Sequence, residues 1–143
     1  MGGRPAPLVQ RLAGSRLERR PEAARNYRGL VTSEKDVREI ALSLPGTSEK
    51  PSYGTPGFRV RDRLFARLRE DNDVLVLWRE SLEEKEFLLE AEPEKFFTTS
   101  HYDGYPMILV RLAAIDRKEL AELLDESWRL RAPKRLVEQA DKG

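Results

Sequence analysis

From about residue 32 onward, hydrophobic residues recur with two different periods, and each change of period predicts a new element. The first apolar residues repeat every three to four positions, behind a weak capping box formed by Ser33 and Asp36. Pro45 and Gly46 then end the pattern, which predicts a helix over residues 33–44. The buried face of this helix is expected to contain Val37, Ile40, Ala41 and Leu44. Residues 47–57 are dense in turn formers and predict a connecting segment.

Residues 58–79 alternate with period two and predict a three-stranded antiparallel meander. The alternation is satisfied if the first loop has three residues, 61–63, so that Val60 pairs with Leu64. A two-residue loop would place arginine on both faces of the sheet, and burying an unpaired arginine is costly. The favoured register puts Phe58, Val60, Leu64, Ala66 and Leu68 on one face, and Arg59, Phe65, Arg67 and Arg69 on the other.

The remaining pattern predicts a helix capped by Ser81 that runs to about Ala91, a short strand over 95–99 and a strand over 107–112. Asp116 caps an amphipathic helix that Pro133 ends. The order is therefore α-β-β-β-α-β-β-α, an α+β domain with two layers. We expect an antiparallel sheet of about five strands with helices on one face, formed by residues 32–143.

Composition limits the chemistry that is available to the 143-residue chain, whose length suits a single domain. It contains no cysteine and a single histidine, which excludes disulfides and disfavours a zinc site. No apolar run approaches the ~20 residues of a membrane span. We therefore expect a cytoplasmic protein without a cofactor and without a membrane segment, monomeric rather than oligomeric.

Charge is distributed unevenly along the chain. Residues 1–31 contain seven arginines and two glutamates, whereas residues 32–143 contain nineteen basic and twenty-three acidic side chains. The basic excess therefore belongs to an N-terminal extension that we predict to be flexible, and the folded body has a net charge of −4.

The segment SHYDGYPMILVRL, residues 100–112, contains the histidine beside two tyrosines and an aspartate. A neutral imidazole could act as a general base, but no serine or cysteine stands at a recognised nucleophile spacing. Asp, Gly and Pro are turn residues, so a turn that leads into a buried strand is the favoured interpretation. A ligand-contacting role is the alternative, in a pocket formed by Tyr53, His101, Tyr102, Asp103 and Tyr105.

Two basic groups are candidates for phosphate contacts. The first follows the predicted meander and comprises Arg59, Arg61, Arg63, Arg67 and Arg69, and the second comprises Arg129, Arg131, Lys134 and Arg135. Arginines beside an aromatic residue suit nucleic acids. A solvated sheet face would also explain the first group, and the dipole of the last helix would explain cations near its C-terminus.

An acidic group surrounds the helix that Ser81 caps. Clustered carboxylates can attract hard cations, although such a run is more often a solvated helix surface. The residues concerned are Glu83, Glu84, Glu86, Glu90, Glu92 and Glu94.

Four blocks together resemble the MmcQ/YjbR family: LPGTSEKPSYGTPGFRV, LFARL, PEKFFTTSHYDGYPMILVRL and ELAELLDESWRLRAPKRL. The resemblance covers about residues 33–136 and implies a CyaY-like fold, a two-layer arrangement on an antiparallel sheet. Members are often labelled DNA-binding, with β-hairpins proposed as wings against the duplex. The hairpin around Arg61, Asp62 and Arg63 would be one wing here.

These observations predict a non-enzymatic binding protein, with double-stranded DNA as the expected partner of the two basic groups. The alternative is a module that binds a small molecule or a protein in the pocket around Tyr53 and His101. An acidic metal site is a remote alternative, by fold analogy with frataxin-like proteins.

Overall fold

A computed structural model describes residues 31–71 and 73–142, so the predicted N-terminal extension lies outside it except for Val31. The helices are α3 (Glu34–Ser43), α4 (Leu82–Ala91), α5 (Arg117–Arg131) and α6 (Lys134–Lys142), with 3₁₀ turns η2 (Ser100–Tyr102) and η3 (Leu112–Ala114). The strands are β1 (Thr47–Ser52), β2 (Thr55–Val60), β3 (Arg63–Leu68), β4 (Val74–Trp78), β5 (Phe96–Phe97) and β6 (Met107–Arg111).

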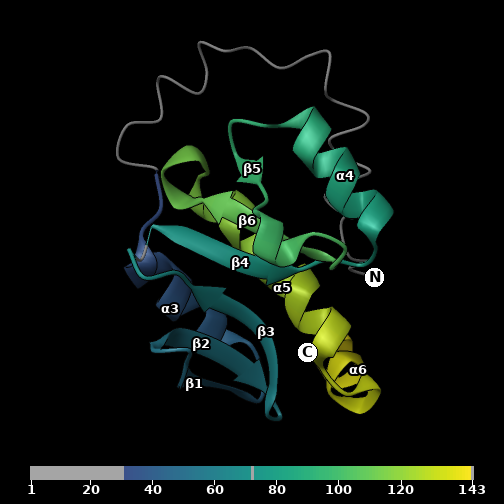
Figure 1. Cartoon of the computed structure of the whole chain (residues 1–143). Coiled ribbons are helices and arrows are strands. Elements are labelled where there is room, and N and C mark those ends of the chain that lie inside the picture. The colour runs from purple at the N-terminus through teal and green to yellow at the C-terminus, as the bar shows by residue number, and fades with distance from the viewer. Residues whose placement is uncertain (1–30, 72, 143) are drawn as a thin grey trace.

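The strands form one antiparallel sheet in the order β1-β2-β3-β4-β6-β5. Helices α3 and α5 pack together on one face of this sheet, and α4 lies against β5 and β6 (Figure 1). Trp128 of α5, Val37 of α3 and Leu88 of α4 share one core with the inward side chains of the strands. The predicted α+β class is therefore confirmed, as are the helices behind Ser33, Ser81 and Asp116.

Two elements of the structure were not predicted. The sequence indicated about five strands and no helix after Pro133. The first is β1, whose side chains are mostly exposed and lack apolar alternation, so only its hydrogen bonds to β2 define it as a strand. The second is α6, which begins at Lys134 and packs Leu136 into the core. Pro133 ends α5 but also precedes a new helix, because its fixed φ suits a helix start.

The β2–β3 hairpin closes through a two-residue turn, so the expected three-residue loop is wrong. Val60 pairs with Arg63, which leaves Arg61 and Asp62 in the turn with φ values of 50° and 69°. Two successive positive φ angles are typical of a type I′ turn, whose twist matches that of the flanking strands. Arginine rarely adopts a positive φ, and aspartate adopts it more readily but at a steric cost that glycine lacks.

A β-bulge then restores the expected pairing away from the turn. Arg59 pairs with Leu64, but the next pair along is Phe58 with Ala66, so β3 accommodates Phe65 as an additional residue. The bulge exchanges two expected positions. Phe65 is fully buried in the core, and Leu64 is half-buried outside it. Arginine is thereby kept out of the core without the longer loop.

The sheet face opposite α5 carries a smaller apolar cluster. Val74 and Val76 of β4 pack there with Leu109 of β6 and with Tyr102 from the segment before β6. Arg67 pairs with Val76 across the β3–β4 ladder and therefore shares this face. The apolar cluster therefore covers the β4 and β6 part of this face, and the half-buried Arg67 of β3 lies beside it.

Glycine in place of Asp62 should relieve the strain in this turn. Asp62→Gly should raise the free energy of unfolding by about 1 kcal/mol, because glycine adopts positive φ without a steric penalty. The lost Lys50–Asp62 ion pair is solvent-exposed and offsets little of this gain. Urea-induced unfolding of both proteins measures the change.

Gly54→Ala in the β1–β2 turn is the matched control. Gly54 has a φ of 81° and no atom within 4 Å of an added Cβ, so only conformational strain can act. The free energy of unfolding of Gly54→Ala should fall below that of the wild type by about the amount by which that of Asp62→Gly rises above it. Changes of the same sign in the two variants would contradict the strain account.

Candidate functional site

A buried lysine fixes the turn that the segment 100–112 forms before β6. Lys85 of α4 is 4% exposed, and its Nζ donates to the carbonyl oxygens of Tyr102 at 2.7 Å and Tyr105 at 2.9 Å. Burial lowers the pKa of Lys85, which the charge of Asp103 partly counters. Gly104 supplies the positive φ of 80° that the turn requires. The expected structural role of this segment therefore has a specific anchor, which sequence reasoning missed.

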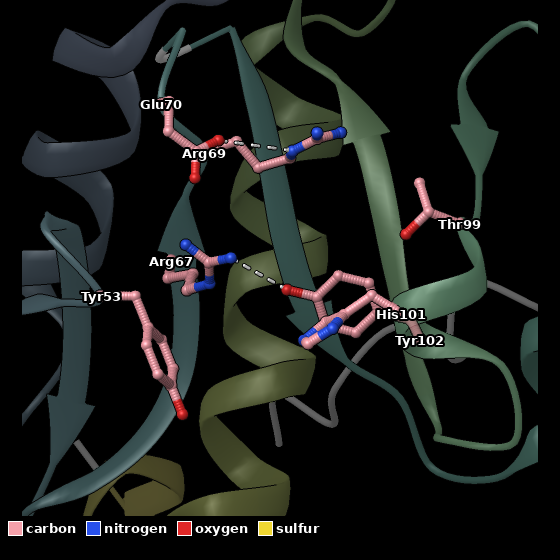
Figure 2. Close-up of a pocket in the computed structure, with 7 residues that line it drawn as sticks. All are labelled: Tyr53, Arg67, Arg69, Glu70, Thr99, His101 and Tyr102. Atoms are coloured by element: carbon pink, nitrogen blue, oxygen red, sulfur yellow. Dashed lines mark hydrogen bonds and ion pairs between the residues drawn. The ribbon is translucent and has the colours of Figure 1, made fainter.

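This turn forms one wall of a cavity of about 340 Å³ on the sheet face opposite α5 (Figure 2). Tyr53 from the β1–β2 turn forms the other wall, and β3 provides the floor. Of the pocket predicted from the sequence, Tyr53, His101 and Tyr102 line the cavity, whereas Asp103 and Tyr105 do not. The other lining residues are Arg67, Arg69, Glu70 and Thr99.

Arg67 lies at the centre of the cavity floor. Its guanidinium donates to Thr55 Oγ1 at 2.9 Å, to the Leu68 carbonyl at 3.4 Å and to the Tyr102 hydroxyl at 3.1 Å. Its Cζ is 5.8 Å from the centre of the Tyr53 ring. Arg67 and Arg69 were expected among the nucleic-acid contacts, on the flanks of the hairpin, and the structure places both in the lining of the cavity.

The other basic residues lie around the β2–β3 turn. A methyl group on Gly46 would stand 3.2 Å from Arg61 Nε and 2.9 Å from Leu136 Cδ2, so the turn and α6 meet there. Burial, together with the nearby charge of Arg63, lowers the pKa of Arg131. We call this region the hairpin-tip surface, and it comprises Lys50, Arg59, Arg61, Arg63, Arg131, Lys134 and Arg135.

The cations of the second group differ in their surroundings. Arg129 pairs with Asp125 at 2.9 Å and with Asp141 at 2.7 Å, so two carboxylates compensate its positive charge. Lys134 and Arg135 occupy the first turn of α6, so the helix dipole disfavours them. The dipole explanation offered for the whole group therefore holds for Arg129 and Arg131 alone, because a second helix begins after Pro133.

The acidic group does not converge on a metal site. Glu84 is buried and accepts from Arg79 Nε at 2.9 Å, and Glu92 is buried beside Lys95 Nζ at 2.9 Å. The other four, Glu83, Glu86, Glu90 and Glu94, are exposed. Within residues 31–71 and 73–142, no three His, Cys, Asp or Glu side chains are grouped so that they could hold a metal ion.

In the same part of the chain, no helix is both long and apolar enough to cross a membrane.

Together these features define a small α+β domain with an open six-stranded sheet, a cavity lined by two arginines and a basic hairpin tip. The family model of YjbR matches residues 42–130. The chain belongs to the YjbR family, as the resemblance of its sequence blocks implied.

Two mycobacterial relatives are similar over most of the chain. They are the uncharacterized proteins Rv2570 of Mycobacterium tuberculosis H37Rv and Mb2600 of Mycobacterium bovis, each 38% identical over 124 residues. Each match covers 85% of this chain and 81% of the relative. The crystal structure of Deinococcus radiodurans protein DR2400, a DUF419 domain, shares the fold, with a TM-score of 0.62 and 22% identity. That match covers 76% of this chain and 88% of DR2400.

The role of Lys85 can be tested by Lys85→Met, which keeps the length of the side chain but removes its donors. Two carbonyl oxygens then lose their partner, so the free energy of unfolding should fall by about 1–3 kcal/mol. Lys118→Met on the exposed side of α5 is the control and should change stability little. If the two substitutions lower the thermal stability equally, Lys85 does not anchor the turn before β6.

The pH dependence of stability provides an independent test of the same residue. Because the pKa of Lys85 is lowered in the folded protein, the unfolded chain holds this proton up to a higher pH, near 10.4. The stability of the wild type relative to Lys85→Met should therefore rise with pH between the lowered pKa and about 10.4. A difference that stays flat through this range would show that the lysine titrates normally.

Proposed function

We propose that this protein is a non-enzymatic DNA-binding protein that contacts the phosphate backbone of the duplex through its hairpin-tip surface. One observation supports this proposal above the others. Arg61 and Arg63 lie in a β-hairpin and Lys134 and Arg135 in a C-terminal helix, yet the two segments meet at Gly46. Arg63 and Arg131 come from the same two parts of the chain and are close enough for their charges to interact. Basic segments that meet from distant parts of a chain suit a polyanion better than they suit the domain itself.

The pairing of these cations supports the proposal further. Within the described part of the chain, Arg61, Arg63, Lys134 and Arg135 are exposed and form no ion pair. Asp62, between the two turn arginines, is paired with Lys50 at 3.1 Å. The positive charge of the turn is therefore available to an external anion.

The cost of placing these residues also favours a ligand. Lys134 and Arg135 stand at the positive end of the α6 dipole, and Arg61 has a positive φ, where arginine is strained. Each placement slightly lowers the stability of the free protein. A phosphate bound beside these residues would offset that cost, because it is attracted to the cations and to the start of the helix. Phosphate contacts orient a protein on DNA without reading sequence, so the proposal implies binding with no base specificity.

The salt dependence of binding tests the proposal in the full-length protein. The affinity for a fluorescent duplex should fall between about 50 and 200 mM salt, with a slope set by the number of phosphate contacts. Arg61→Ala combined with Arg63→Ala should weaken binding and make the log–log slope shallower by about 2. Fluorescence anisotropy measures both quantities.

Lys35→Ala combined with Lys118→Ala is the matched control. Both lysines are exposed, and Lys118 lies about 20 Å along α5 from Arg131, at 1.5 Å per residue. This pair removes the same charge, and the basic N-terminal segment is present in every variant. If the two double variants behave alike, or if neither changes the slope, the hairpin-tip surface is not the binding surface.

A further inference from the structure

The cavity on the open sheet face shares no lining residue with the hairpin-tip surface. Its side chains suit a different kind of ligand. We propose that it binds a small molecule in which a carboxylate or phosphate group is attached to a planar ring. The anionic group would lie against Arg67 and Arg69, and the ring against Tyr53. This site is independent of nucleic-acid binding.

Arg67 is prepared for an anion before any ligand arrives. Three hydrogen bonds hold its guanidinium in place, and all three acceptors are neutral oxygens of Thr55, Leu68 and Tyr102. A guanidinium has five N–H donors, so donors remain for an external acceptor. Within the described residues Arg67 has no carboxylate partner, which leaves its charge uncompensated. A fixed, unpaired arginine is well suited to a carboxylate or a phosphate.

Arg69 adds a second positive charge to the same floor. Its Nε is 4.0 Å from Glu70 Oε2, and the Glu70 side chain is 74% exposed, so this pair is loose. The lining thus contains two guanidinium groups against one carboxylate. That balance favours a ligand with a negative charge over a neutral or cationic one.

Tyr53 supplies the reason to expect a planar ring. It is 91% exposed although it is a large aromatic residue, and its φ of 54° lies in the left-handed region. This position of a type I′ turn favours Asn, Asp or Gly, so tyrosine lowers the stability of the hairpin. Figure 2 shows its ring on one side of Arg67, with His101 and Tyr102 on the other. A ring that enters the cavity can stack on Tyr53 while its acidic group reaches Arg67.

The size of the cavity restricts the ligand further. A volume of about 340 Å³ is at the lower end of the range for small-molecule sites. One ring with one acidic group fits this space. The hydroxyl of Thr99 and the exposed imidazole of His101 are available for additional polar contacts at the rim.

Four probe compounds separate the parts of this proposal in the full-length protein. Phenyl phosphate and benzoate contain both the ring and the anion, benzamide contains the ring alone, and inorganic phosphate the anion alone. Backbone amide shifts in NMR titrations should saturate at Tyr53, Arg67 and His101 with at least one of the aromatic anions. That compound should bind about tenfold more tightly than benzamide and inorganic phosphate, because each lacks one of the two contacts.

Tyr53→Asn removes the ring and leaves an Asn-Gly sequence, which is a preferred type I′ turn. Its affinity for the aromatic anion should fall about fivefold or more while its melting temperature stays the same or rises. Arg67→Gln should abolish binding. Tyr105→Ala, in the same segment as His101 but outside the cavity, should bind normally.

Three results would overturn the assignment. They are the absence of saturable shifts at the cavity with both aromatic anions, equal affinity for benzamide, and an unchanged affinity in Tyr53→Asn. Shifts centred on Arg61 and Arg63 would likewise show that the anion binds at the hairpin-tip surface and not in the cavity.

Discussion

The bulge in β3 is the constraint on which both candidate surfaces depend. A two-residue turn alone would bring arginine into the core, and a three-residue loop alone would lack the twist of a type I′ hairpin. One additional residue, Phe65, resolves the conflict by entering the core beside Ala66. Arg67 then faces the open side of the sheet and Arg61 stays at the tip. A single irregularity in one strand therefore separates the arginines into two groups with different surroundings.

Buried cations hold the rest of the site in place. Lys85 binds the two carbonyl oxygens of the turn before β6, and Arg79 pairs with Glu84 at 2.9 Å and Glu126 at 2.7 Å while its backbone N–H donates to Pro106. Charges in such positions are tolerated only when hydrogen bonds replace the water they lose. These two residues connect α4 and α5 to the turn, so the position of His101 depends on contacts that lie beneath it.

Much of the fold could be predicted from local patterns, because caps and helical periodicity are properties of short segments. Asp116 and Ser81 cap α5 and α4, as the sequence predicted. The strand β1 could not be predicted, because its pairing with β2 and not its side chains makes it a strand. The site was predictable only in part. His101 and Tyr53 attract attention as residue types, but the convergence of Arg67 with them requires contacts between residues far apart in the sequence.

The two ends of the sheet have a consequence for how copies of this protein can meet. An open sheet exposes unpaired backbone groups along its outer strands, and a second sheet can extend it there. Here β1 presents Glu49, Lys50 and Pro51 at one edge, and proline has no N–H to donate. At the other edge β5 is two residues long. Neither edge offers a flat, apolar template, so the sheet can stay open without promoting continuous β-sheet between molecules.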